Sequence, residues 1–171
     1  MSLELDAEVL YAELRQAVSG LWRDDAALVG IWSGGAWLAE RLQKDLALPG
    51  GEQGHGVISS TLHRDDFGSR GLAGSDATRL PFAIDGRHIL LIDDVLFTGR
   101  TLRAVVNELF DFGRPASVTL AVLVDRGGRE LPVAAAFAAA RTVLPAGQRL
   151  RLARADGGRF AFSLSEITER A

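Results

Sequence analysis

The stretch ILLIDDVLFTGRT, residues 89–101, combines an apolar run, two adjacent carboxylates and a turn that carries hydroxyl groups. The continuous apolar residues 88–92 predict a strand that is buried on both faces of a parallel sheet. Such a strand delivers Asp93 and Asp94 to the carboxyl edge of the sheet, where open α/β proteins bind ligands. The turn after it consists of Thr98, Gly99, Arg100 and Thr101. This turn opens a predicted helix, and backbone N–H groups at a helix start attract anions, so we expect a site for phosphate beside hydroxyl groups or a bridging metal ion.

A plainer interpretation of the same stretch stays open. The residues also suit an ordinary strand-to-helix turn, in which Asp94 caps the helix and Gly99 supplies a positive φ. An isolated pair of aspartates would favour that interpretation. The offset between the pair and Thr-Gly-Arg-Thr favours the ligand site instead.

The rest of the chain alternates predicted strands with amphipathic helices, which indicates an α/β fold with a parallel sheet. Strands are predicted over 27–32, 56–62, 88–92 and 117–124, and helices over 7–22, from about 36 to 46, and over 101–112. On the last of these helices, Glu108 and Asp111 are expected to be surface charges. Residues 149–154 and 159–164 alternate polar and apolar side chains around Asp-Gly-Gly, which predicts a C-terminal β-hairpin. The polar stretch 63–80 is long for a connection and predicts a binding loop or lid.

Composition narrows the class of protein. The chain has 171 residues, 47% of them hydrophobic, a net charge of −3 and no cysteine. We therefore expect one domain over 1–171, and the missing cysteines exclude disulfides, thiolate zinc sites and cysteine nucleophiles. The three histidines lack metal-ligand spacing, so no metal site built from side chains alone is expected. Apolar runs such as 133–140 are too short to span a bilayer, which favours a cytoplasmic protein without membrane contact.

Four blocks of the sequence resemble one family in both composition and spacing. The segment 89–101 looks like the phosphoribosyl pyrophosphate (PRPP) motif of type I phosphoribosyltransferases. Together with LHRDD (62–66), IDDVLFTGRTLRA (92–104) and FGRPASVTLAVLVDRGGRELP (112–132), it resembles the PyrR family of pyrimidine operon regulators and uracil phosphoribosyltransferases. The resemblance runs from about residue 28 to residue 137. It implies a type I phosphoribosyltransferase fold, with a central, mostly parallel sheet flanked by helices.

The resemblance also implies roles for individual residues. Asp93 and Asp94 would act on the ribose hydroxyls, and Arg64 would assist catalysis from the lid that begins with Asp65 and Asp66. The other residues implied to bind substrate are Val95, Thr98, Gly99, Arg100 and Thr101 for the ribose phosphate, and Ser33, Gly34, Gly35, Arg126 and Arg129 for the pyrophosphate side. Residues after Phe137 would cover the base. Phe97 stands where purine-using relatives carry an acid, which counts against a purine acceptor.

Two departures from the family pattern bear on function. Active members usually carry Thr-Arg-Gly where this chain has Ser33, Gly34 and Gly35, which weakens the expected hold on pyrophosphate. On the face that binds RNA in the family, Gly128 replaces a histidine and Ala134 replaces a basic residue. The arginines that remain as candidates for that face are Arg129, Arg141, Arg15 and Arg23, the last two placed on the first helix.

The resemblance implies a uracil phosphoribosyltransferase that makes UMP and pyrophosphate from uracil and PRPP, with Mg²⁺ entering alongside PRPP. The resemblance also implies a role in regulating pyrimidine genes. It further implies RNA as a partner and a homodimer or larger homo-oligomer. The alternative is a regulator that binds nucleic acid and keeps the PRPP and UMP site only as a sensor. A phosphoribosyltransferase for another base is a third, weaker alternative.

Overall fold

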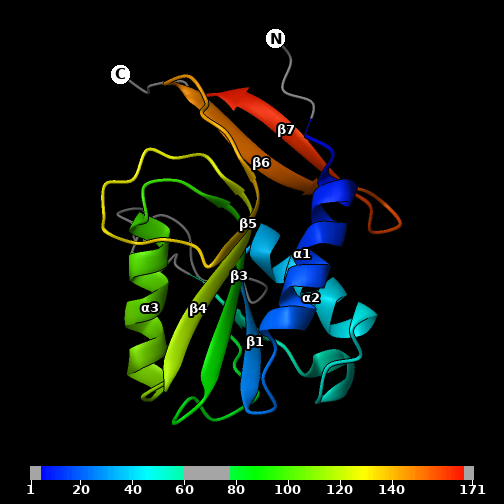
Figure 1. The fold of residues 1–171 in the computed structure, drawn as a ribbon, viewed down its shortest axis with the longest axis vertical. Coiled ribbons are helices and arrows are strands. Elements are labelled where there is room, and N and C mark those ends of the chain that lie inside the picture. The colour runs from blue at the N-terminus through cyan, green and yellow to red at the C-terminus, as the bar shows by residue number, and fades with distance from the viewer. Residues whose placement is uncertain (1–4, 60–77, 168–171) are drawn as a thin grey trace.

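The computed structural model describes residues 5–59 and 78–167 and forms a parallel sheet between helices (Figure 1). The strands of the sheet are β1 (Ala26–Ile31), β2 (Gly56–Ile58), β3 (His88–Leu96), β4 (Ser117–Asp125) and β5 (Phe137–Arg141). They lie in the order β2-β1-β3-β4-β5, and each neighbouring pair is parallel. The antiparallel hairpin consists of β6 (Gln148–Arg154) and β7 (Phe160–Glu166). This architecture confirms the predicted fold class.

Helices cover both faces of the sheet. The helices are α1 (Ala7–Leu21), α2 (Gly34–Asp45) and α3 (Arg100–Phe112), with a single 3-10 turn η1 (Gly51–Gln53). Figure 1 shows α3 on one face and α1 with α2 on the other. Neighbouring strand residues therefore point into different cores: Leu90 packs with α1 and α2, and Leu91 packs with α3. None of the helices in the described part of the chain has the length and apolar character that crossing a bilayer requires.

Helix α1 has a side-chain cap at its start and packs against the sheet. The Asp6 carboxylate accepts hydrogen bonds from the backbone N–H groups of Glu8 and Val9, which caps the helix start as the sequence predicts. Leu14 and Val18 are fully buried against the sheet. The helix ends at Leu21, so the expectation that Arg23 lies on it is wrong, and Arg23 belongs to the turn before β1.

The sheet differs from the sequence-based expectation at three strands. β3 continues beyond residue 92 to Leu96, because Asp93 and Val95 stay in register with residues of β4 despite the low strand propensity of aspartate. β2 ends at Ile58, short of the predicted 56–62, of which 60–62 lie outside the described residues. The sequence analysis did not predict β5, because its sequence FAAAR has little strand propensity. This segment forms a strand because it pairs with β4.

Glu108 of α3 is another difference, because it was expected at the surface but is buried with 5% of its area exposed. Its Oε1 accepts a hydrogen bond of 2.7 Å from the Thr78 hydroxyl, which in turn accepts one from the Ser59 N–H. The network connects α3 with the residues on either side of 60–77. Asp111, also expected at the surface, is exposed.

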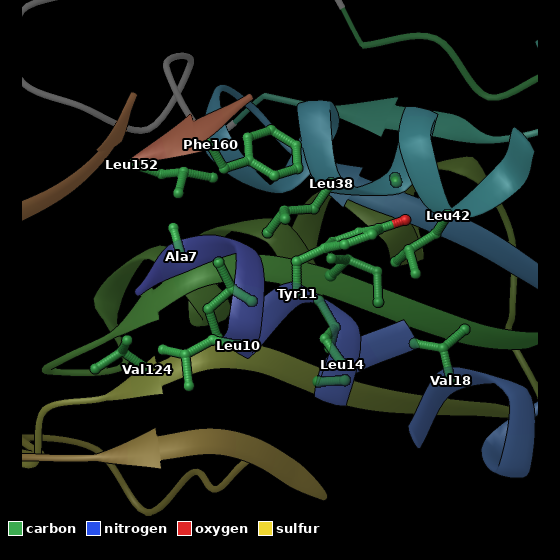
Figure 2. Packing of buried hydrophobic residues seen from close by; sticks show 14 of the residues in the cluster. Ala7, Leu10, Tyr11, Leu14, Val18, Leu38, Leu42, Val124, Leu152 and Phe160 are labelled. Atoms are coloured by element: carbon green, nitrogen blue, oxygen red, sulfur yellow. The ribbon is translucent and has the colours of Figure 1, made fainter. Parts of the chain in front are cut away.

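The C-terminal hairpin docks on α1 and α2 through both apolar and charged contacts. Phe160 is 3% exposed and packs on Tyr11, with ring centroids 5.7 Å apart. Figure 2 shows Phe160 and Leu152 of the hairpin among the core side chains of α1 and α2. The Glu8 carboxylate joins the three elements, because it accepts hydrogen bonds from Arg41 and from the Phe160 N–H. The Arg41 partner holds the pKa of Glu8 below its ordinary value.

We expect Phe160→Ala to cost about 3 to 5 kcal/mol of unfolding free energy, because it removes a buried ring and leaves a cavity under the hairpin. Chemical denaturation measures the loss. The matched control is Leu164→Ala on the same strand, where the side chain is 50% exposed and the cost is expected below about 0.5 kcal/mol. Equal losses in the two variants would show that the hairpin is not held by this core.

His55 gives the stability a pH dependence. Its ring is buried, its Nδ1 has no hydrogen-bond partner, and burial followed by the nearby Arg79 charge lowers its pKa below 6.5. Below pH 6.5 the unfolded chain therefore binds a proton that the folded chain does not, and stability falls as the pH drops toward the folded pKa. We expect a loss of up to about 1.4 kcal/mol per pH unit as the pH falls from about 6.5 toward the lowered pKa of the folded state. Denaturation across this range should show a shallower slope for His55→Gln, and an unchanged slope would contradict the assignment.

Candidate functional site

A pocket of about 470 Å³ lies at the carboxyl edge of the sheet, between the ends of β1, β3 and β4 and the strand β6. Most of the residues singled out from the sequence line it: Ser33, Gly34, Asp93, Asp94, Val95, Thr98, Gly99, Thr101 and Arg126. Parallel strands bring these residues together because their carboxyl ends meet at one edge. The pocket is thus where the sheet concentrates its polar side chains.

A larger hollow of about 700 Å³ lies between α1, α2 and the hairpin turn. Its charged side chains pair with one another, Arg41 with Glu8 and Arg154 with Glu40. None of the residues that the sequence predicts for the site lines it. We therefore assign the candidate site to the smaller pocket.

The two carboxylates of the pocket are half-buried and held by backbone groups. Asp93 accepts a hydrogen bond from the Asp94 N–H, and Asp94 accepts one from the Val95 N–H, each of 2.9 Å. The other Asp94 oxygen accepts a longer bond of 3.3 Å from the Leu152 N–H of β6. Asp94 thus connects the sheet edge with the hairpin above it.

The start of α3 supplies backbone donors to the same pocket. Gly99 precedes the helix with φ 92°, a backbone conformation that disfavours side chains, and an added Cβ would lie 2.5 Å from Val133. No side chain caps the helix, so its first N–H groups stay available apart from that of Arg100, which donates to the Thr98 hydroxyl. Free N–H groups and the positive end of the helix dipole make this turn an anion site. Asp94 does not cap the helix, because it lies within β3.

The turn after β1 continues into the first residues of α2, which pack closely against β3. A Cβ at Gly34 would lie 2.5 Å from Oδ2 of Asp94, and one at Gly35 would lie 2.2 Å from the carbonyl oxygen of Ile92. Gly30 is needed as well, because its Cβ would lie 2.4 Å from the Gly35 carbonyl oxygen. Ser33 and Gly34 line the pocket, whereas Gly35 lies beneath it against β3.

The three predicted arginines of the described site have different surroundings. Arg126 is 6% exposed and lines the pocket. Arg129 is outside the lining: its guanidinium bonds to the carbonyl oxygens of Phe97 and Val133 and to the Asp125 carboxylate. Arg100 is exposed and pairs with Glu130 at 2.6 Å.

The partner of Arg129, Asp125, has a lowered pKa. Burial raises its pKa, but the hydrogen bonds from Arg129 and from the Gly127 N–H outweigh burial and hold the pKa below its ordinary value. Arg129 and Asp125 together brace the loop after β4. This bracing is the geometry of a structural pair, which is not itself part of the pocket lining but holds the carbonyl group of Phe97, a lining residue.

Sequence reasoning named no individual residue of β6 for the site, yet the β6 residues 149–152 line the pocket. Phe97, which the sequence connects with the choice of acceptor, lines it as well, and so does Trp32. The resemblance implies that residues after Phe137 cover the base. Of these residues, β5 extends the sheet, and β6 lines the pocket. Arg64, Asp65 and Asp66, with most of the predicted lid, lie outside the described residues.

The acidic residues of the pocket fit a Mg²⁺ ion that arrives with a phosphate ligand. Within residues 5–59 and 78–167, no three His, Cys, Asp or Glu side chains gather to hold a metal ion. Asp93 and Asp94 remain as two oxygen donors in the pocket. Mg²⁺ is commonly bound by one or two carboxylates together with substrate phosphates and water, so this donor set suffices.

The comparisons with known proteins agree with this geometry. Residues 3–141 match the family described as "Phosphoribosyl transferase domain". The bifunctional protein PyrR of Ralstonia nicotianae is 48% identical over 170 residues, covering 95% of each chain, and that of Nitrosococcus oceani is 41% identical over 172 residues, covering 99% of this chain and 97% of the other.

Solved structures support the fold independently. The hypoxanthine phosphoribosyltransferase of Trypanosoma cruzi matches with a TM-score of 0.56 at 19% identity, over 84% of this chain and 82% of that one. A hypoxanthine-guanine-xanthine phosphoribosyltransferase matches with a TM-score of 0.57 at 20% identity, over 82% and 80%. Similarity at this identity speaks for the fold alone. Fold, family match and near-full-length relatives together mean that the chain belongs to the phosphoribosyl transferase domain family and, within it, to the PyrR proteins.

Proposed function

We propose that this protein is a uracil phosphoribosyltransferase, which transfers the phosphoribosyl group of PRPP to uracil and releases UMP and pyrophosphate. The observation that carries the proposal is the single pocket shared by two carboxylates, the open start of α3 and the glycine loop after β1. These parts match the hydroxyl groups, the 5-phosphate and the pyrophosphate of PRPP. The naming of the relatives as PyrR supports a pyrimidine acceptor.

Each half of PRPP has residues that fit it. The backbone of 98–101 and the hydroxyls of Thr98 and Thr101 suit the 5-phosphate. Asp93 and Asp94 suit the ribose hydroxyls, since carboxylates accept hydrogen bonds from hydroxyl groups. The side chain of Arg100 is turned to Glu130 and its N–H donates to the Thr98 hydroxyl, so the donors left for the phosphate are the N–H groups that follow in the first turn of α3.

The pyrophosphate would lie over the loop after β1, at Ser33 and Gly34. This loop contributes backbone groups and a hydroxyl but no charged side chain. When bound with PRPP, Mg²⁺ held by Asp93 or Asp94 would neutralise part of the charge that develops on the leaving pyrophosphate. The pair of carboxylates also favours positive charge on the ribose ring, as an oxocarbenium-like transition state requires.

The strand order supports a position for the acceptor base on the other side of the pocket. Direct displacement at the anomeric carbon needs the nucleophile and the leaving group on opposite faces of the ribose. The sheet has β1 and β4 on opposite sides of β3, which carries the two carboxylates. With pyrophosphate at the end of β1, the base would enter at the end of β4, between Phe97, Arg126 and the β6 residues 150–152.

A regulatory role is the second candidate, because both near-full-length relatives are named bifunctional. RNA as a partner and a homo-oligomer remain predictions from the resemblance. Of the arginines suggested for an RNA-binding face, Arg129 is engaged with Asp125 and with two carbonyl groups. This engagement makes it a weaker candidate for contacts with RNA. Arg15, Arg23 and Arg141 are exposed. The sensor alternative would keep the PRPP site and lose turnover.

A turnover assay with PRPP, Mg²⁺ and uracil tests the proposal directly, with UMP as the measured product. We expect uracil-dependent turnover, with hypoxanthine and orotate much slower. Asp94→Asn should lower the rate by about 100-fold or more, because it removes negative charge from the ribose side of the pocket. Absence of turnover, with UMP or PRPP still raising the melting temperature, would replace the enzyme by the sensor.

Gly34→Ala tests the close packing beneath the site. Its Cβ would lie 2.5 Å from the Asp94 carboxylate and push it aside, so we expect PRPP binding to weaken by about tenfold or more. The dissociation constant for PRPP, measured by calorimetry, gives the effect. Gly20→Ala in α1 is the matched control, because nothing lies within 4 Å of its Cβ and PRPP binding should not change. Equal PRPP affinity in the two variants would contradict the proposed role of Asp94.

A further inference from the structure

Arg126 is the one positively charged side chain in the described pocket lining that is also buried. It follows the last residue of β4, and its guanidinium lies 3.8 Å from the centroid of the Phe97 ring. Its Nη1 donates a hydrogen bond of 2.8 Å to the carbonyl oxygen of Gln148, where β6 begins. Arg126 therefore stands between the aromatic side chain at the end of β3 and the start of the hairpin.

The charge of Arg126 has no anionic partner among the described residues. It takes part in no ion pair there, and its Nε is buried without a hydrogen-bond partner. The adjacent Asp125 is bound by Arg129 and by the Gly127 N–H. Burial lowers the pKa of Arg126, as expected where a charged group loses water.

The other charged groups around the pocket are Asp93 and Asp94 of β3 and Arg149 and Arg151 of β6. Neither carboxylate lies within ion-pair distance of Arg126, and the two β6 arginines are exposed. An unpaired buried cation is costly unless an anion comes to it. The β4 side of the pocket therefore favours a negatively charged ligand group, whereas the β3 side carries the carboxylates.

The proposed acceptor can supply that negative charge. The N1 nitrogen of uracil carries a hydrogen and has its lone pair delocalised into the ring, so it becomes a strong nucleophile when the proton leaves. The resulting charge spreads over both carbonyl oxygens. Phe97 can accept no proton, and the remaining acids of the lining, Asp93 and Asp94, are assigned to the ribose.

We propose that Arg126 determines acceptor specificity by stabilising the N1 anion of the pyrimidine in the β4 side of the pocket. The inference rests on the proposed function and adds the form in which the acceptor reacts. The N1 proton passes to solvent, the N1 electron pair forms the bond to the anomeric carbon, and the bond from that carbon to pyrophosphate breaks with its electrons on the leaving oxygen. This assigns Arg126 to the base, in place of the pyrophosphate side that the sequence suggests.

The test compares Arg126→Met and Arg126→Lys with the wild-type protein on uracil and 5-fluorouracil. Methionine keeps much of the length and the packing on Phe97 but has no charge, whereas lysine keeps the charge and loses the planar stack. Fluorine makes N1 more acidic, so 5-fluorouracil needs less help to ionise. We expect Arg126→Met to lose about 10- to 100-fold in kcat/KM for uracil, the cost of one charge-assisted interaction.

The pattern across bases and pH separates this role from others. The loss in Arg126→Met should be clearly smaller for 5-fluorouracil and should shrink as the pH rises toward the ionisation of free uracil. Arg126→Lys should retain most of the wild-type pH profile, and the KM for PRPP should stay unchanged in both variants. Equal losses for the two bases at every pH would assign Arg126 to structure alone, and a raised KM for PRPP would assign it to pyrophosphate. Either result overturns the proposal.

A measurement on the wild-type protein removes any dependence on the folding of variants. Uracil binding in the presence of ribose 5-phosphate should release a proton, which calorimetry detects in buffers of different ionisation enthalpy. No proton release at a pH below the ionisation of free uracil would also overturn the proposal. If the wild-type protein turns over no uracil at all, the proposed function fails first, and the two failures are thereby distinguished.

Discussion

The candidate site depends on one close approach between backbone segments, that of the start of α2 to the carboxyl half of β3. Gly34 and Gly35 permit it, since a Cβ at either residue would lie 2.5 or 2.2 Å from an oxygen of β3. Gly30 permits the adjoining approach of β1 to α2, where its Cβ would lie 2.4 Å from the Gly35 carbonyl oxygen. The Asp94 carboxylate is one of the groups in that contact. Any side chain at residue 34 would have to share the space of Asp94, so the loop after β1 and the carboxylate pair cannot vary independently.

This constraint also bears on the departure from the family pattern. Where active members of the family usually carry an arginine, this chain has Gly34, which removes a positive charge beside the proposed pyrophosphate position and admits the close contact with Asp94. The buried cation of the pocket, Arg126, lies at the end of β4 and not beside the loop after β1. It therefore does not replace the charge of the missing arginine. If the protein acts as proposed, a bound metal ion would have a larger share of the leaving-group charge to neutralise here than in a chain with arginine in the loop.

The local sequence pattern was enough to predict the parts of the fold that depend on interactions between residues close in the sequence. The apolar run 88–92, the cap at Asp6 and the glycine at the start of α3 act within a few residues, and each lies where the sequence predicts. Long-range pairing decided the rest. β5 has little intrinsic strand preference and is ordered by β4, and Glu108 is buried because Thr78, 30 residues away in sequence, supplies its hydrogen-bond donor. The same holds for Arg126, whose contacts with Phe97 and Gln148 no local pattern encodes.

Because of the strand order, the negatively charged side chains and the buried positive one lie on different sides of the pocket. Carboxylates stand at the end of β3 and a buried guanidinium at the end of β4, in the same pocket but not paired. Opposite charges so placed would form an ion pair if the side chains were free to meet. Arg126 is held back because Phe97 takes one face of its guanidinium and the Gln148 carbonyl takes an N–H group. The Phe97 ring therefore helps to keep the two charges apart. Under the proposed mechanism, a sugar that becomes cationic and a base that becomes anionic would then each meet the charge that favours them.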